Sequence, residues 1–150
     1  GDMLCENTGI QNVSFDKNVV LANGLFRGCR RLKTANLSKI QNSECTDDLF
    51  RDCIALRQVK INKNWKYIEN RIFYNCRNLT SVNIPSKVRR VGSKAFGNCR
   101  SLKKIKMPKS VKKIEKDAFK GCKKLTLYVK RGSYAHKYAK KYHVKYKYWK

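Results

Sequence analysis

Apolar residues recur along this chain with a fixed period, which is unlike the pattern of a single globular core. The motif Phe-x-x-Cys-x-x-Leu begins at Phe26, Phe50, Phe73, Phe96 and Phe119, so its copies are 23 or 24 residues apart. A period of this length is typical of stacked repeat proteins, in which each unit buries its apolar face only against its neighbours. The recurring columns are therefore predicted to be core, and function must lie in what the stack displays outward.

Each middle repeat continues from its leucine into two apolar positions two residues apart, which indicates a short strand with one buried face. These pairs are Ala35 and Leu37, Val59 and Ile61, Val82 and Ile84, and Ile105 and Met107. Pro85 and Pro108 close the last two strands, because proline cannot donate to a ladder. A second apolar set follows, such as Trp65 and Ile68, and its spacing of three and four predicts a helical or 3₁₀ turn on the back of the repeat.

The two ends of the chain depart from the repeat. We interpret the chain as one domain, 1–150, made of a degenerate N-terminal repeat (1–25), the repeats (26–125) and a C-terminal cap (126–150). Within the cap, Ser133 is predicted to begin a helix that ends at about Tyr142, and a last strand is predicted from Val144 to Trp149. A unit of this kind hides the open end of a stacked core.

The repeat resembles the BspA-like leucine-rich repeats. Residues 73–96 match the pattern Phe-x-x-Cys-x-x-Leu-x-x-Val-x-Ile-Pro-x-x-Val-x-x-Ile-Gly-x-x-Ala-Phe almost position for position, and residues 132–139 are similar to the usual C-terminal end of that family. The resemblance implies an α/β repeat solenoid, which is a curved right-handed leucine-rich-repeat stack of about five 23-residue repeats. Short strands would form the concave face, short helical or 3₁₀ turns would form the back, and a helix and strand would form the C-terminal cap.

The same resemblance implies a secreted or cell-surface protein of bacteria or some protists, often concerned with adhesion and protein binding. It brings no catalytic residues and no cofactor. Residues 1–20 contain no signal-peptide core, so we expect that a secretory signal was removed upstream of residue 1. No stretch of the chain approaches the ~20 apolar residues of a membrane helix.

Seven cysteines would normally suggest disulfides in a secreted protein, but five of them share one column. The column consists of Cys29, Cys53, Cys76, Cys99 and Cys122. Its adjacent members would lie ~5 Å apart with parallel Cβ directions, which permits a disulfide but does not favour one. Buried free thiols are the favoured state; disulfides and zinc are the alternatives, and no metal site is predicted, because a stacked row is not tetrahedral. Cys45 is interpreted as a small core residue in the column of Ile68, and the redox state of Cys5 is left open.

Positive charge is concentrated in the second half of the chain. Residues 1–75 hold 12 Lys or Arg against 8 Asp or Glu, whereas residues 76–150 hold 24 against 2, which accounts for the net charge of +26. Such a field attracts polyanions and makes their binding salt-dependent. The alternative is a solvated face that keeps a repeat protein soluble.

The strand register predicts an outward surface that is small and polar in the middle repeats and basic in the last ones. The candidate ligand-binding residues are Lys60, Lys103, Lys104, Lys106, Lys124, Lys130 and Arg131. Aromatic residues near the C-terminus either add ligand contacts or plug the end of the core. No enzyme is predicted, since the chain has no phosphate-binding glycine loop and neither His136 nor His143 stands beside an acid or serine pattern.

Three functions therefore compete. The favoured one is a non-catalytic extracellular or cell-surface binding module, acting as a monomer on a host extracellular protein or on an anionic glycan or cell-wall polymer. A nucleic-acid-binding protein is the weaker alternative, because the sequence pI of about 10.1 supports it but no recognition helix does. A spacer within a larger surface protein is the third.

Overall fold

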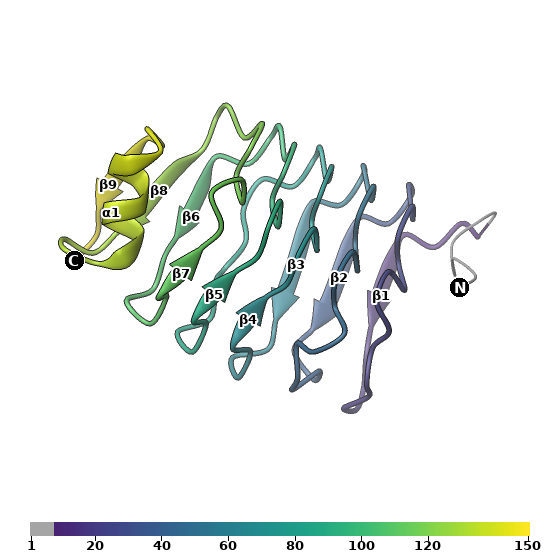
Figure 1. Cartoon of the computed structure of the whole chain (residues 1–150). Coiled ribbons are helices and arrows are strands. Elements are labelled where there is room, and N and C mark those ends of the chain that lie inside the picture. Colours follow the sequence, from purple (N-terminus) through teal and green to yellow (C-terminus); the bar gives the residue numbers. More distant parts are fainter. Residues whose placement is uncertain (1–7) are drawn as a thin grey trace.

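The computed structural model describes residues 8–150 and is a stack of coils whose main strands lie side by side along one face (Figure 1). One parallel sheet contains β1 (Asn12–Ser14), β2 (Thr34–Leu37) and β3 (Gln58–Ile61); a second contains β6 (Lys104–Lys106), β8 (Thr126–Val129) and β9 (Tyr146–Tyr148). Between them, residues 81–84 make only an isolated parallel bridge, from Ser81 to Lys104. We call the outward side of all these segments the strand face.

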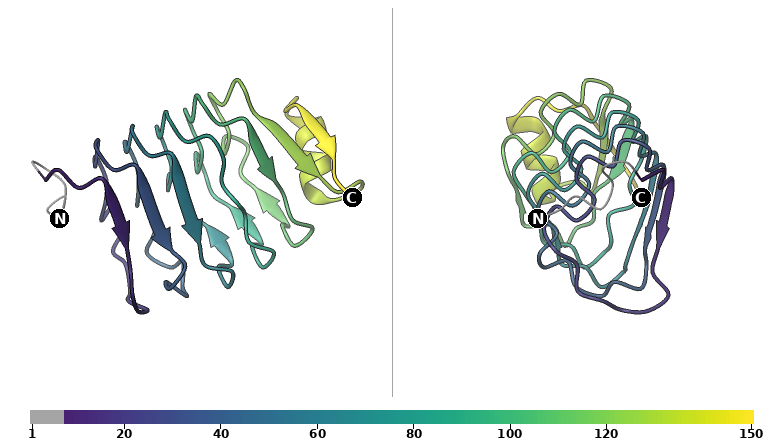
Figure 2. Two further views of the ribbon diagram at one scale, coloured as in Figure 1. Left: turned by 180° about the vertical axis from the view of Figure 1, so that it is seen from behind. Right: turned by 90° about the vertical axis from the view of Figure 1, so that its right-hand side faces the viewer.

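The predicted strand periodicity is confirmed in every repeat. Val82 and Ile84 are buried while Ser81 and Asn83 are exposed, so even the segment without a continuous ladder keeps the alternation. The view along the stack shows the strands on one side of the coil and the connecting turns on the other (Figure 2). The repeat solenoid predicted from the sequence is therefore the fold of this chain.

The back of the stack differs from the prediction, because Ile68 and its counterparts, expected in a helical or 3₁₀ turn, lie in short strands. Three two-residue strands, β4 (Tyr67–Ile68), β5 (Arg90–Val91) and β7 (Lys113–Ile114), pair in parallel as a further small sheet. Single turns follow them, for example the turn closed by the Tyr74 N–H donating to the Arg71 carbonyl at 3.0 Å. Ile68, Val91 and Ile114 recur in register, and β-branched residues pack well when the backbone is extended.

The five motif phenylalanines form one continuous stack through the core. Neighbouring ring centroids along Phe26, Phe50, Phe73, Phe96 and Phe119 are 5.6, 5.8, 5.3 and 5.4 Å apart, with interplanar angles of 4° to 24°. Each ring is buried. Since a repeat period fixes where each ring lies, the column that the sequence predicted becomes a column of ring-on-ring contacts.

The cysteine column has a specific role in this core. The thiols of Cys53, Cys76, Cys99 and Cys122 each donate to the carbonyl oxygen of the motif phenylalanine one repeat earlier, at 2.9 to 3.1 Å. All four are free, as predicted, and burial raises the pKa of Cys53 to about 12 and raises the pKa of Cys76 and Cys99 as well. The prediction was wrong for Cys29, which is disulfide-bonded. Cys5 lies outside the described residues.

Cys45 was also misplaced by the sequence analysis. It is exposed and has a φ of 61°, whereas Ser43 and Thr46 are buried in its place. The Thr46 hydroxyl donates to the Ser43 carbonyl at 2.6 Å, so the buried hydroxyl is satisfied. The first full repeat is one residue longer than the others, and this changes which residues of the turn point inward.

The C-terminal cap forms as predicted. Helix α1 (Tyr134–Lys141) begins after Ser133, whose hydroxyl accepts from the His136 N–H at 3.2 Å. Tyr138 closes the phenylalanine stack, with its ring edge on Phe119 at 6.2 Å and its hydroxyl donating to the Lys116 carbonyl at 3.2 Å. Within residues 8–150, no helix has the length and apolar character needed to cross a bilayer.

Candidate functional site

The outward side chains of the strand face form two parallel rows across the stack. One row contains Thr34, Gln58, Ser81 and Lys104; the other contains Asn36, Lys60, Asn83, Lys106 and Tyr128. Strand pairing sets the rows, because Thr34 lies opposite Gln58, Ser81 opposite Lys104 and Lys106 opposite Tyr128. Side chains in one row repeat at the ~4.8 Å spacing of adjacent strands.

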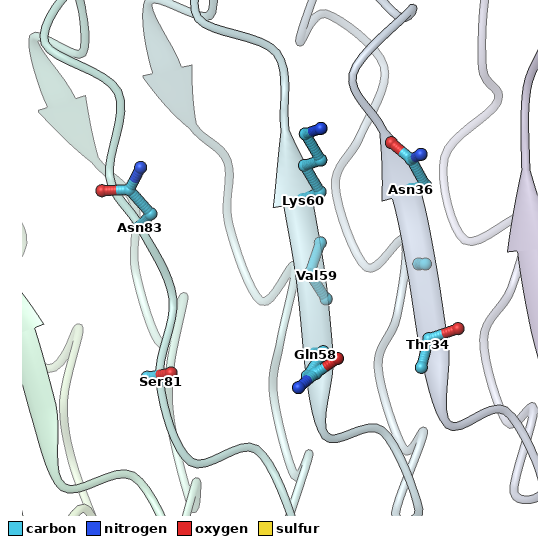
Figure 3. A pocket seen from close by; sticks show the side chains of 8 residues that line it. Thr34, Asn36, Gln58, Val59, Lys60, Ser81 and Asn83 are labelled. Atoms are coloured by element: carbon cyan, nitrogen blue, oxygen red, sulfur yellow. The ribbon is translucent and has the colours of Figure 1, made fainter.

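The middle of the strand face is a polar hollow of about 420 Å³. It is lined by Thr34, Ala35, Asn36, Gln58, Val59, Lys60, Ser81 and Asn83, and the six polar members stand in the two rows (Figure 3). Within residues 8–150, the side chains of Gln58, Ser81 and Asn83 make no hydrogen bond with the protein. The hollow therefore offers amides and a hydroxyl that can both donate to and accept from a ligand.

Towards the C-terminus the same face becomes basic and aromatic. The Lys104 ammonium lies 4.4 Å from the ring centroid of Tyr128. The ammoniums of Lys106 and Lys130 both lie over the Trp149 ring, at 3.8 and 4.0 Å. These cation–π contacts position the lysines without cancelling their charge.

The acidic residues that pair with cations lie mostly in the earlier repeats. Asp48 contacts Arg71 at 2.9 Å and Arg51 at 3.4 Å; although burial would raise the pKa of Asp48, these two guanidiniums outweigh it and hold that pKa below its usual value of 3.8. Among the described residues that follow Arg90 in the sequence, the only ion pair joins Lys113 to Glu115, on the back of the stack. The lysines of the strand face are therefore not neutralised by carboxylates.

The structure brings together only some of the residues predicted to bind a ligand. Lys104, Lys106 and Lys130 meet the aromatic rings just described, and Arg131 lies over Tyr148 at 4.4 Å. Lys60 lies in the polar hollow, and residues 81–84 lie between its strand and that of Lys106. Lys103 and Lys124 are exposed in the turns just before β6 and β8, outside the two rows.

The C-terminal aromatic residues divide between two roles. Tyr138 is buried and plugs the core, and burial raises its pKa. Tyr134, Tyr142 and Tyr148 are exposed, so they do not plug it. Sequence reasoning missed the part played by Trp149, although the alternation along the last strand already placed Trp149 on the same side as Lys145 and Lys147. Its lysine neighbours follow from the parallel pairing of β9 with β8.

Comparison with known proteins identifies the class to which this geometry belongs. A model of the BspA-type leucine-rich repeat region matches residues 1–126 in six copies. The chain therefore belongs to the BspA-type leucine-rich repeat family, as its repeat motif indicated. A comparison with curated proteins finds no match.

Solved structures of three bacterial proteins share the fold. A leucine-rich repeat protein of Bacteroides ovatus is 27% identical over 93% of this chain, with a TM-score of 0.78. The Treponema pallidum leucine-rich repeat protein is 23% identical over 81% (TM-score 0.73), and a leucine-rich cell surface protein of Faecalibacterium prausnitzii is 23% identical over 83% (TM-score 0.72). The chain spans 36%, 60% and 33% of the lengths of these proteins, respectively.

Proposed function

We propose that this chain is a non-catalytic binding module of a secreted or cell-surface protein, and that it binds an anionic polymer through the C-terminal half of the strand face. The observation that carries the proposal is the set of lysines there that are held in place by aromatic rings and have no carboxylate partner among residues 8–150. The family and the cell-surface neighbour support the location. Lysine-rich surfaces attract polyanions mainly as point charges, so many contacts would share the binding energy.

The alternatives have weaker support on this surface. Stacking of nucleic-acid bases needs open aromatic faces, but lysine ammoniums already lie over the rings of Tyr128 and Trp149. A repeat that served only as a spacer would have no reason to gather its positive charge in one region. In this chain, the cations without an acidic partner among the described residues are concentrated in the last repeats and the cap.

The test compares two charge-reversed proteins of equal net charge. The first carries Lys104→Glu, Lys106→Glu and Lys124→Glu; the second carries Arg27→Glu, Lys33→Glu and Lys39→Glu. All six residues are exposed, so both proteins should unfold at temperatures similar to that of the parent protein. Binding to heparin is measured by calorimetry at two salt concentrations.

We expect the first protein to lose much more affinity than the second and to show a shallower dependence of affinity on salt, because fewer counterions are released on binding. Each protein changes the total charge equally, so only the position of the changes differs. Equal losses would show that heparin senses the bulk charge alone, and the proposed binding surface would then be abandoned.

A further inference from the structure

A second hollow, of about 380 Å³, adjoins the polar one where the strands end. Its walls come from three successive repeats and from the cap: Lys63 from the first, Asn83 and Pro85 from the second, Lys106 and Pro108 from the third, and Trp149 from the chain end. Neither proline has an N–H group, so this part of the wall is apolar and leaves no backbone donor unsatisfied. The rim, in contrast, carries two ammonium groups and an amide.

The charges at this hollow favour an anionic group. The ammonium groups of Lys106 and Lys130 lie within 4.0 Å of the same Trp149 ring centroid, and neither has a carboxylate partner among residues 8–150. A carboxylate or sulfate of a ligand would provide the counter-charge that these two ammonium groups lack.

The rest of the ligand must match an uncharged, hydrogen-bonding surface. Asn83 lines both hollows, so they are adjacent, and the path across them runs from Lys106 past Asn83 to Lys60 and Gln58. The free amides and hydroxyl of the polar hollow pair naturally with the hydroxyl groups of a sugar chain. The partly exposed ring of Pro108 suits the C–H face of a sugar ring, whereas Pro85 is buried.

Other polymers fit this path less well. A polypeptide partner would be expected to meet exposed aromatic or aliphatic anchors, yet all exposed large hydrophobic residues among the described ones lie outside the two rows. They are Val20, Tyr67, Tyr134, Tyr142 and Tyr148. Addition of a peptide as an extra strand needs a free sheet edge. In the sheet of β6, β8 and β9, only β9 has a neighbour on one side alone, and it lies at the opposite side of that sheet from the polar hollow.

We propose that this second hollow is the subsite for an acidic sugar unit of a glycan chain. Lys106, with Lys130 and Lys63 nearby, binds the carboxylate or sulfate. Pro108 contacts the sugar ring, and Asn83 binds its hydroxyl groups. The neighbouring sugar units lie along the polar hollow. The inference rests on the proposed function and names the chemical class of ligand that this surface takes.

The test uses two variants that leave the net charge unchanged. Asn83→Ala removes the shared amide from an exposed position, with the exposed Asn78→Ala as its matched control. Trp149→Ala removes the ring that positions two lysines, with the exposed Tyr134→Ala as its control. The probes are a hyaluronan tetrasaccharide (carboxylate only), a heparin-derived tetrasaccharide (carboxylate and sulfate), cellotetraose (neutral), inorganic polyphosphate and an oligoglutamate peptide.

We expect Asn83→Ala to weaken binding of at least one acidic tetrasaccharide about fivefold to tenfold, which is the loss of about one net hydrogen bond. Trp149→Ala should have an effect of at least that size, because it releases two lysines. The control variants Asn78→Ala and Tyr134→Ala should bind every probe as the parent protein does, and Asn83→Ala should leave polyphosphate binding unchanged. The tetrasaccharide with the larger loss identifies carboxylate or sulfate as the preferred group. If Trp149→Ala disturbs the cap, the exposed Asn83→Ala decides the result alone.

Several results would overturn the acidic-sugar subsite while leaving the broader polyanion proposal intact. One is that Asn83→Ala binds both acidic tetrasaccharides as tightly as the parent protein does, while the two charge-reversed proteins still differ in their affinity for heparin. Another is an equal loss of affinity for polyphosphate and for the acidic sugars in Asn83→Ala. If neutral cellotetraose binds as tightly as the acidic sugars, the hollow does not select an anionic group. If oligoglutamate binding depends on Asn83 to the same extent, the partner is a protein and not a glycan.

Discussion

The phenylalanine stack leads to a quantitative prediction about what holds neighbouring repeats together. Phe50 and Phe73 are fully buried, with ring centroids 5.8 Å apart and planes only 4° from parallel. Leucine in place of either ring keeps an apolar side chain of moderate size but removes the ring–ring contact. A double-mutant cycle of Phe50→Leu and Phe73→Leu therefore isolates that contact from the general cost of repacking the core.

The expected magnitude follows from the number of rings that each residue touches. Phe73 stacks on Phe50 and, at 5.3 Å, on Phe96, so Phe73→Leu should cost ~1–3 kcal/mol in lost ring contacts, with up to ~1.5 kcal/mol more from repacking. The coupling energy between positions 50 and 73 should be ~0.5–1.5 kcal/mol. A matched cycle of Phe26→Leu with Phe73→Leu should show coupling below ~0.5 kcal/mol, because the Phe50 ring lies between them.

Urea unfolding followed by circular dichroism measures all of these quantities. The slope of the free energy against urea should stay constant across the variants, so that differences in the midpoint report stability. If the two cycles give the same coupling energy, ring stacking adds nothing to simple burial, and the phenylalanine column is only a hydrophobic column. A change in slope would instead show that the stack no longer unfolds as one unit.

Two further predictions concern the thiols and one ion pair. In the native protein, exposed Cys45 should react fastest with a thiol reagent, and half-buried Cys122 should react more slowly. The buried thiols of Cys53, Cys76 and Cys99 should react only after denaturation. Labelling of these three in the native protein, measured by mass spectrometry, would contradict the packing described. Asp48→Asn should lower the free energy of unfolding by ~1–3 kcal/mol at neutral pH, since it removes the charge-assisted bonds to Arg71. Because the pKa of Asp48 is lowered on folding, its charge stabilises the fold above the usual pKa of 3.8. The difference in free energy of unfolding between the parent protein and Asp48→Asn should therefore disappear as the pH falls through the folded-state pKa. A stability difference that persists in acid would refute this.

The sequence alone determined the features that the period repeats. Each copy of the motif specifies the same place in the coil, so the phenylalanine, cysteine and leucine columns and the alternation along the strands could be predicted residue by residue. The polar and basic character of the strand face followed directly, since Ser81, Asn83, Lys104 and Lys106 lie between buried strand positions. Ser133 marked the start of the cap helix because N-capping is a local interaction.

Only the tertiary structure decided the features that have no periodic copy. Cys45 turned outward because an extra residue changes the path of one turn, and the small sheet on the back depends on pairing between repeats. Trp149 meets Lys106 only because β9 pairs in parallel with β8, and no local pattern specifies which strand the cap will join. The hollow proposed as the acidic-sugar subsite is lined by three repeats and by Trp149 of the cap, so its residues could be read from the sequence but their assembly depends on contacts between distant residues.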